Sequence, residues 1–457
     1  MAEFNASFEE TVQTLLEEKK YSAIKNLVSP MAASDVAALF ERLDEKQVFV
    51  LFRLLAKEKA ADVFVEMDNA FQEFLIRGFS DTELKEILDE MYANDAADLV
   101  EEMPANVVDR ILKQIKPTMR KEINHLLQFP ENSAGSIMST EYIALRPGTT
   151  VGEAIAQIRK SGFDNKSFYT CYVTQNKQLL GRLSVKDLLL AKDDDIKIDE
   201  LMKPNVITVN THEDKEEVSK LLSKYNFYAL PVVDGDNRMV GIISFDDALE
   251  VMEDEATEDI EIMGGMTPSE KTYLRSTPFD LFRHRIAWLM LLMVSATFTG
   301  MIITGFESAL AAQVVLTAFI PMLMDTGGNS GSQSSVTIIR ALSLGEVDFR
   351  DLPKIVWKEI QTAVMCGGVL ALICFCKIML VDRLLLRNPD ITLFVALVVC
   401  MTMALTVLVA KIIGCTLPLC AKKLKLDPAV MASPFITTIV DAVSLLVYFS
   451  IARAVLF

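Results

Sequence analysis

The sequence contains few of the residues that bind soft metals. Its 457 residues include only three histidines, and none of its seven cysteines forms a C-x-x-C pair. We therefore expect no zinc or copper site built from thiolates and imidazoles. The remaining ligands are carboxylates, amides, hydroxyls and backbone carbonyls, which suit Mg²⁺, Ca²⁺ or Mn²⁺.

The sequence also lacks the arrangements on which enzymes depend. It has no recognisable nucleophile–base arrangement and no phosphate-binding loop. Because both are missing, we predict that the protein is not an enzyme.

The first residues, MAEFNASFEE, have neither a basic start nor an apolar core, so we expect no cleavable signal.

The charge is distributed unevenly along the chain, whose formal net charge is −17. Residues 1–275 hold 51 acidic and 31 basic residues, whereas residues 276–457 hold 11 acidic and 14 basic residues. An acidic soluble part joined to a mildly basic apolar part argues against a nucleic-acid partner and favours divalent cations.

Residues 1–130 have the pattern of short amphipathic helices with an internal repeat. The segments VAALFERL (36–43), AADVFVEM (60–67) and AADLVEEM (96–103) resemble one another. This spacing predicts a small α-helical solenoid. Asp95 and Asp98 lie on its polar faces, where a solvated surface is the simpler interpretation of any single acid.

Residues 131–255 contain a clearer duplication. GRLSVKDLL (181–189) is echoed by GIISFDDAL (241–249), and each follows an apolar strand. This α/β repeat resembles a tandem pair of CBS domains. In that family, aspartates at the positions of Asp187 and Asp247 often bind the ribose of adenine nucleotides such as ATP. Many CBS pairs bind no nucleotide, so both interpretations remain open.

Nine acidic residues and no basic residue lie between positions 246 and 261. Acids three or four positions apart repel one another on a helix. The segment is therefore either a solvated acidic helix or a helix whose self-repulsion is relieved by bound divalent ions. We assign residues 256–277 to a connecting helix that leads into the membrane part.

Residues 278–457 read as a pore domain of five transmembrane helices. The five apolar segments are 286–305, 309–324, 355–380, 391–420 and 434–457. The second continues through DTGGNSGSQSS, and we expect Pro321 and the glycines Gly327, Gly328 and Gly331 to break it in mid-membrane. Irregular backbone at that depth is tolerated where it lines a hydrated cavity, so the break predicts a pore-lining segment.

Basic residues orient the chain in the lipid bilayer. If the N-terminus is cytoplasmic, nine basic residues flank the inner ends of the five segments and four flank the outer ends. We therefore predict a multi-pass protein of the inner (plasma) membrane with cytosolic acidic domains.

Asp441 lies within the last apolar segment. A carboxylate at that depth is costly and usually faces a water-filled path or a cation. The simpler alternative is a structural ion pair with Lys411 or Lys377, the two lysines expected at comparable depth.

PMLMDTGGNSGSQ (321–333) and LDPAVMASPFITTIVD (426–441) together resemble the MgtE family of magnesium channels, and the likeness covers nearly the whole chain. The resemblance implies a homodimer with a pore at the dimer axis, lined by Asp441, Gly328 and Asn329. Thr437 would add a hydroxyl that accepts hydrogen bonds from the waters that Mg²⁺ retains. Asp325 is a further candidate metal ligand of the pore. The chain departs from the family at Asp325 and Lys411: these two could pair with each other and leave Asp441 free for the ion, or they could change the selectivity of the pore.

The resemblance also implies cytosolic Mg²⁺ sites that control the pore. Bound ions would stabilise a closed arrangement, and low Mg²⁺ would let like charges separate the domains. With the acids of the helical domain included, the predicted regulatory residues are Asp95, Asp98, Asp214, Glu216, Asp247, Glu250, Glu255, Glu258, Asp259 and Asp427.

The sequence therefore predicts a Mg²⁺-gated channel for Mg²⁺ uptake. A first alternative is a divalent-cation transporter coupled to H⁺ or Na⁺, which a pair between Asp325 and Lys411 would favour. A second alternative is a membrane-anchored nucleotide sensor. The predicted break in the second membrane segment argues against this sensor, because a simple anchor does not need a broken helix.

Overall fold

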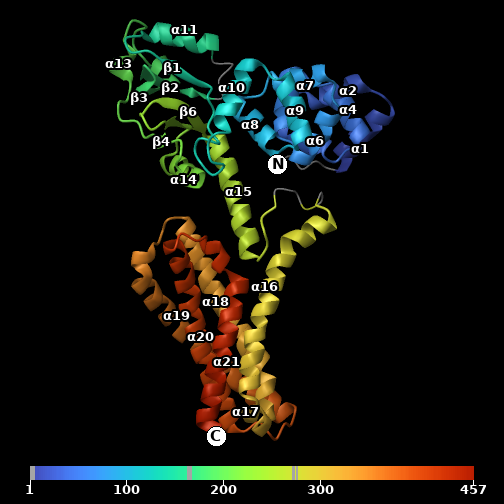
Figure 1. Ribbon diagram of the computed structural model, residues 1–457, viewed down its shortest axis with the longest axis vertical. Helices are drawn as coiled ribbons and strands as arrows, with labels where there is room; N and C mark the ends of the chain where they lie inside the picture. Colours follow the sequence, from blue (N-terminus) through green and yellow to red (C-terminus); the bar gives the residue numbers. More distant parts are fainter. Residues whose placement is uncertain (1–5, 162–166, 270–272, 274–275, 457) are drawn as a thin grey trace. The chain divides into compact units, whose positions relative to one another are not determined.

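The computed structural model describes residues 6–161, 167–269, 273 and 276–456 (Figure 1). The chain divides into two compact units, Met1–Glu255 and Ala256–Phe457.

The described part of the first unit begins with ten short helices, in which alternate members α3, α5, α7 and α9 contact one another in series. Their bounds are α1 Ala6–Glu17, α2 Tyr21–Val28, α3 Ala33–Phe40, α4 Glu45–Phe52, α5 Lys57–Val65, α6 Asn69–Gly78, α7 Asp81–Leu88, α8 Ala93–Glu102, α9 Ala105–Gln114 and α10 Pro117–Leu126.

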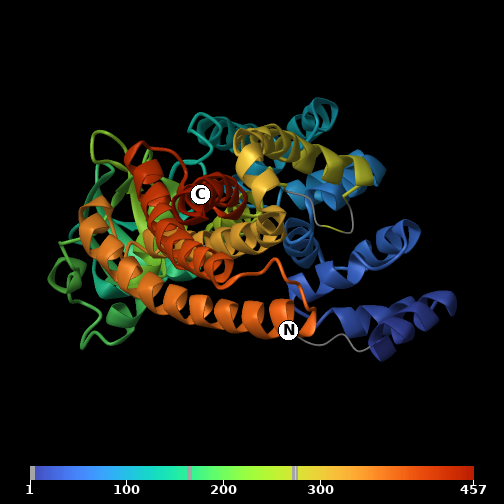
Figure 2. The ribbon, with the colours of Figure 1, turned by 90° about the horizontal axis from the view of Figure 1, so that it is seen from below.

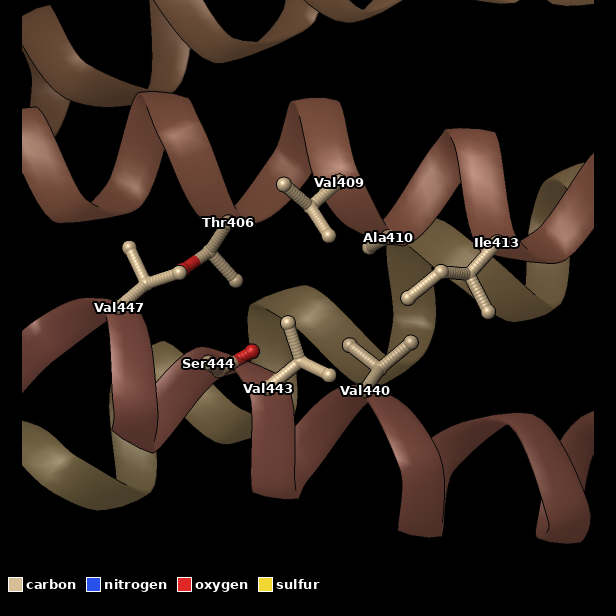
Figure 3. Close-up of a pocket in the computed structure, with 8 residues that line it drawn as sticks. All are labelled: Thr406, Val409, Ala410, Ile413, Val440, Val443, Ser444 and Val447. Carbon is tan, nitrogen blue, oxygen red and sulfur yellow. The ribbon is translucent and has the colours of Figure 1, made fainter.

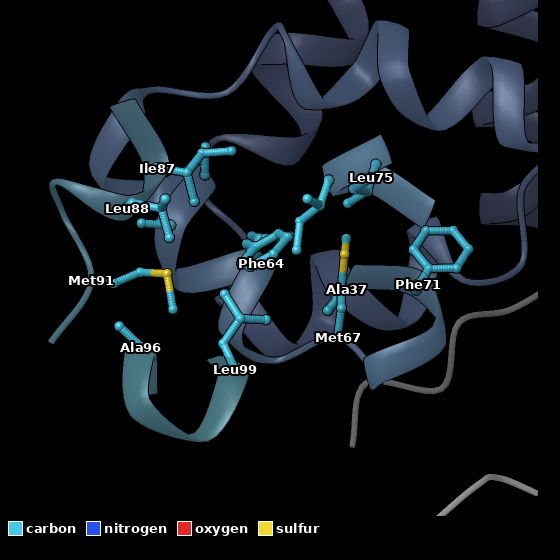
Figure 4. Packing of buried hydrophobic residues seen from close by; sticks show 14 of the residues in the cluster. Ala37, Phe64, Met67, Phe71, Leu75, Ile87, Leu88, Met91, Ala96 and Leu99 are labelled. Atoms are coloured by element: carbon cyan, nitrogen blue, oxygen red, sulfur yellow. The ribbon is translucent and has the colours of Figure 1, made fainter. Parts of the chain in front are cut away.

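The internal repeat of this region is a repeat of buried positions. Its three segments lie on α3, α5 and α8, and the first, second, fourth and fifth residue of each segment are buried. Phe64 and Leu99 of two of these segments pack in one core, which also contains Leu75 of α6 (Figure 4). Burial of the same face in each segment explains why the repeat is visible in the sequence.

The duplicated region forms two three-stranded sheets of the same topology, β1-β2-β3 and β4-β5-β6. In each sheet the first strand is parallel to the second, and the second is antiparallel to the third. The strands are β1 Tyr142–Leu145, β2 Ser167–Gln175, β3 Gln178–Ser184, β4 Val209–Asn210, β5 Ala229–Val233 and β6 Met239–Ser244, and the helices are α11 Val151–Ser161, α12 Val185–Leu189, α13 Ile198–Leu201 and α14 Lys215–Tyr225.

The acidic segment is helical, as predicted, and forms most of α15 (Phe245–Met263). The division between the two units falls within this helix. In the second unit, the chain after α15 packs on the start of the membrane helices. Thr267 and His284 are linked by a backbone hydrogen bond of 2.9 Å, and a Cβ at Gly265 would collide with Trp288 and lie 3.0 Å from Pro434 Cγ.

The second unit is a bundle of helices (Figures 1 and 2). Its elements are α16 Pro278–Gly305, α17 Glu307–Ala312, the 3-10 helix η1 Val314–Phe319, α18 Ile320–Ser343, the 3-10 helix η2 Phe349–Asp351, α19 Leu352–Lys377, the π-helix η3 Ile378–Leu385, α20 Leu393–Lys423, the 3-10 helix η4 Pro428–Met431 and α21 Ser433–Leu456. The most extensive contacts join α18, α19, α20 and α21, and the C-terminus at the end of α21 is seen among the orange and red helices in Figure 2.

Within the described residues, four segments are long and apolar enough to cross a membrane: Pro278–Gly305, Phe349–Leu385, Leu393–Lys423 and Pro428–Leu456. They match four of the five predicted segments. The other predicted segment runs through α17, η1 and α18, and its crossing of the membrane stays a prediction.

The predicted break at the glycines is wrong. The structure shows α18 as a continuous helix from Ile320 to Ser343, with Pro321 in its first turn, where proline fits because it lacks only an N–H that would have no helical partner. Gly327, Gly328 and Gly331 are buried, and they let neighbouring helices approach closely. The irregular backbone lies before α18, in η1, rather than within it.

Candidate cation site

The glycines of α18 set how this helix crosses α21. A Cβ at Gly328 would lie 2.9 Å from Thr437 Cγ2, and one at Gly331 would lie 2.8 Å from Ile436 Cγ2. A Cβ at Gly327 would lie 2.9 Å from Ser444 Oγ. Later residues of α18 thus face earlier residues of α21, so the two helices run antiparallel here.

This antiparallel register brings together the two acids predicted to line the pore. Asp325 precedes Gly328 by about one turn, and Asp441 follows Thr437 by about one turn. Asp325 is exposed in the single chain and Asp441 is half-buried. The two carboxylates are near enough to interact electrostatically, and no described base forms an ion pair with either.

The remaining predicted pore residues lie beside these acids. Asn329 is exposed and is four positions after Asp325, which places the two on one face of α18. Thr437 is four positions before Asp441, and its hydroxyl donates a hydrogen bond of 3.0 Å to the carbonyl oxygen of Pro434. We call Asp325, Gly328, Asn329, Thr437 and Asp441 the acidic strip. Its carboxylates, amide and hydroxyl are ligands that suit hydrated Mg²⁺.

The lysines that might have neutralised the strip are engaged elsewhere. Lys411 Nζ lies 3.6 Å from Glu359 Oε2, and Lys377 Nζ lies 2.8 Å from Asp382 Oδ2. Lys411 therefore does not pair with Asp325, which excludes the first of the two roles considered for these residues. Because each lysine already has a carboxylate partner, neither forms the alternative ion pair with Asp441.

A crevice between α20 and α21 lies near the strip but has a different character (Figure 3). Its lining is mostly aliphatic, with two hydroxyls and no carboxylate: Thr406, Val409, Ala410, Ile413, Val440, Val443, Ser444 and Val447. Since Mg²⁺ requires oxygen ligands and usually at least one carboxylate, this crevice does not provide a cation site.

The predicted regulatory acids do not form a metal centre in the single chain. Within the described ranges, no group of three or more His, Cys, Asp or Glu side chains is placed to hold a metal ion. Asp214 instead caps α14, accepting hydrogen bonds from the N–H groups of Glu216 and Glu217, and Glu216 pairs with Lys220 at 2.6 Å. Asp427 caps η4 through the N–H of Ala429 at 2.8 Å.

These acids are also divided between the two compact units. Asp95 and Asp98 lie on α8, and the first part of α15 carries Asp247, Glu250 and Glu255. Glu258, Asp259 and Asp427 belong to the second unit.

The two aspartates predicted to contact nucleotide have the same local geometry. Asp187 Oδ2 accepts hydrogen bonds from the N–H and hydroxyl of Ser184, and Asp247 Oδ2 does the same with Ser244. The Ser184 hydrogen bond is the main reason that the pKa of Asp187 is lowered. The S-x-x-D pattern is therefore a helix-capping box in both repeats, whether or not it also contacts nucleotide.

Sequence reasoning missed Glu359 and Ser334. Glu359 lies 52 positions before its partner Lys411 and follows Lys358, so it resembles an ordinary charge at the start of a helix. Ser334 lies within a run of small polar residues. An intramembrane lysine nevertheless indicates that a carboxylate partner exists, and that signal was available.

Comparisons with known proteins place this geometry in a known class. Family models match the divalent cation transporter domain at residues 320–451, the MgtE intracellular N domain at 31–132 and the CBS domain at 134–194 and 198–254. The first match contains the entire acidic strip. The architecture is therefore that of a membrane transporter for divalent cations.

Relatives that match over almost their whole length identify the family. The magnesium transporter MgtE of Thermus thermophilus is 34% identical over 98% of this chain and 98% of its own. The protein of the same name from Bacillus subtilis is 30% identical over 96% of this chain and 95% of its own. The chain belongs to the MgtE family of magnesium transporters.

Solved structures agree for the first unit. The cytosolic domain of the Mg²⁺ channel MgtE in complex with ATP is 33% identical, with a TM-score of 0.51, and covers 53% of this chain and 99% of its own. The soluble part of a magnesium transporter is 26% identical, also with a TM-score of 0.51, and covers 54% and 98%.

Proposed function

We propose that this protein is a Mg²⁺-gated channel that admits Mg²⁺ through the inner membrane. The observation that carries the proposal is the acidic strip. Asp325 and Asp441 lie in an apolar bundle without a basic partner among the described residues, while Lys377 and Lys411 are each paired with another acid. A hydrated divalent cation would supply the missing positive charge.

Membrane potential alone would drive such a channel. Moving two charges through 100 mV releases about 4.6 kcal/mol, at ~2.3 kcal/mol per charge. No coupling ion is required. The rival transporter coupled to H⁺ or Na⁺ loses its main support, because Lys411 pairs with Glu359 rather than with Asp325.

The test is Mg²⁺ influx into proteoliposomes under an imposed potassium diffusion potential. The channel predicts influx that rises with inside-negative voltage when no proton or sodium gradient is present. Influx that requires one of those gradients at fixed voltage would support the coupled transporter instead.

A second copy of the chain would complete the pore. Asp325 and Asn329 are exposed on α18, and none of the described residues of α16 is buried in the single chain. Two copies that faced each other through α18 would place two acidic strips around one path. Light scattering of the detergent-solubilised protein should give the mass of a dimer, and a monomeric mass would contradict this arrangement.

For gating, we propose that Mg²⁺ bound by the predicted regulatory acids stabilises the closed state of the pore. Several of these acids lie on one helix, α15, among them Asp247, Glu250 and Glu255. Without Mg²⁺, the acids of α15 repel one another. Proteolytic cleavage near residues 250–275 should therefore decrease as Mg²⁺ rises through the millimolar range, and cleavage that is independent of Mg²⁺ would contradict the proposal.

ATP is a candidate ligand for the CBS pair, because the similar cytosolic domain of an MgtE channel was solved with ATP. Asp187 and Asp247 are the residues proposed to contact its ribose. Calorimetric titration of the soluble unit with ATP should show binding that Asp247→Ala weakens by about tenfold or more, as expected for loss of a hydrogen bond to a charged group.

A further inference from the structure

Three polar side chains from three different helices meet in the second unit. Lys411 of α20 donates a hydrogen bond of 3.2 Å to Ser334 Oγ of α18, and Ser334 Oγ donates one of 2.7 Å to Glu359 Oε2 of α19. Lys411 Nζ lies 3.6 Å from the same carboxylate oxygen. We call Ser334, Glu359 and Lys411 the buried triad.

The triad is shielded from its surroundings. The side chain of Lys411 is 6% exposed, that of Glu359 is 16% exposed, and Ser334 is buried. Both charges are costly to bury alone, but together they are neutral and hydrogen-bonded. Any movement of one helix that separated them would leave an uncompensated charge among apolar side chains, so the triad opposes such movement.

The triad lies beside a close approach of α18 and α20. A Cβ at Gly414 would collide with the carbonyl oxygen of Gly331, and a Cβ at Gly331 would lie 3.2 Å from the carbonyl oxygen of Ala410. Ser334 is about one turn beyond Gly331, and Lys411 is adjacent to Ala410. The glycines permit the approach, and the triad adds a polar interaction of fixed direction.

Asp325, which belongs to the acidic strip, lies on the other side of α18 from Ser334. Asp325 and Ser334 are nine positions apart, which is about two and a half turns, so their side chains point in opposite directions from α18. A rotation of α18 that disturbed the triad would therefore move Asp325 and Asn329 by a similar angle.

We propose that Ser334, Glu359 and Lys411 are positioning residues, which fix the rotation of α18 and so hold the acidic strip in its ion-binding geometry. They need not contact the ion. This inference rests on the proposed function, because it assigns the triad a role in Mg²⁺ selection and passage rather than in folding alone.

The test compares Glu359→Gln, Lys411→Met and the double variant in proteoliposomes. Mg²⁺ influx is expressed per folded protein, and the ratio of Co²⁺ to Mg²⁺ influx is measured in parallel. Each single variant should lower Mg²⁺ influx by about tenfold or more and change the ratio, because small misplacements of binding groups are costly. Glu359→Gln should have the larger effect, since it leaves the more deeply buried charge without its partner.

The double variant separates positioning from other roles. It removes both charges, so influx should return to within about threefold of the parent protein. Lys354→Met is the matched control on α19: its side chain is 86% exposed and pairs with Asp351 at 3.3 Å, and influx should be unchanged.

Three results would overturn the inference. Influx through the double variant could be no better than through the worse single variant. The single variants could change influx in opposite directions, which would indicate a direct field effect on the ion. Influx per folded protein could be unchanged while the folded yield falls, which would indicate a role in folding only. If the parent protein itself passes no Mg²⁺, the proposed function fails instead.

Discussion

Lys411 and Asp441 both lie in long apolar helices, but their surroundings differ. Lys411 is enclosed with Glu359 and Ser334, and its charge is cancelled within the chain. Asp441 is half-buried, and its charged neighbour is a second acid, Asp325. A buried charge paired with an opposite charge stabilises one arrangement of helices. Two acids without a basic partner instead attract a cation from outside the chain.

The largest expected effect comes from removing the charge of Asp441. Asp441→Asn keeps the shape of the side chain but leaves one carboxylate fewer for the ion. Mg²⁺ influx into proteoliposomes should fall by about 100-fold or more, which corresponds to roughly 2.7 kcal/mol of barrier. If a folded Asp441→Asn variant kept most of the influx, Mg²⁺ passage would not depend on the charge of Asp441, and the contrast with the paired Lys411 would fail.

The next largest effect should come from disturbing the close crossing of α18 and α20, which lies beside the buried triad. Gly414→Ala would push a methyl group against the backbone of Gly331, because a Cβ there collides with its carbonyl oxygen. We expect a loss of about 1–3 kcal/mol in stability, visible as a lower melting temperature in detergent, together with reduced influx.

Gly368→Ala is the control for this substitution. Gly368 also lies within a helix of the bundle, but a Cβ there would have nothing within 4 Å. Its melting temperature should be unchanged or slightly raised, because alanine favours helix more than glycine does. Equal destabilisation by the two substitutions would mean that the close crossing is not responsible.

A smaller effect should follow from Asp325→Asn. Asp441 remains available to the ion, so we expect a decrease in Mg²⁺ influx of about threefold to tenfold, typical of losing one peripheral charge contact. Competition between Mg²⁺ and Co²⁺ in the same vesicles would show whether the second acid contributes to selectivity. An increase in influx would show that Asp325 hinders the ion.

The smallest effect belongs to the first unit. Ser184→Ala removes the hydroxyl that lowers the pKa of Asp187, and should cost about 1 kcal/mol of stability at neutral pH. A lowered carboxyl pKa stabilises the fold above the unfolded-state value, and this contribution is lost as pH falls through the folded-state value. The difference in unfolding free energy between parent and variant should therefore shrink in acid, while Mg²⁺ influx at neutral pH is unchanged.

Much of the fold follows from patterns in the sequence. The buried faces of α3, α5 and α8 repeat in the sequence, and the S-x-x-D boxes of the CBS pair recur at equivalent positions. The four long apolar segments were also correctly predicted. Each of these signals is local, because burial and capping impose residue types at fixed spacings.

The errors concern contacts between distant helices. Glycines in an isolated segment suggest a break, but in a bundle they serve helix packing, as Gly331 and Gly414 do. The sequence likewise shows Lys411 without showing that Glu359, rather than Asp325, is its partner. Spacing along the chain does not determine which of two carboxylates a lysine meets across a helix interface.

Whether a divalent cation binds at the acidic strip can be measured by anomalous X-ray scattering from crystals of the full-length protein grown with Mn²⁺ as a substitute for Mg²⁺. We expect a peak beside the carboxylate of Asp441, on the face of α18 that carries Asp325 and Asn329, and its loss in Asp441→Asn. An Asp441 side chain bonded to a lysine, or turned towards lipid with no aqueous route beside it, would show that the strip is not a cation path.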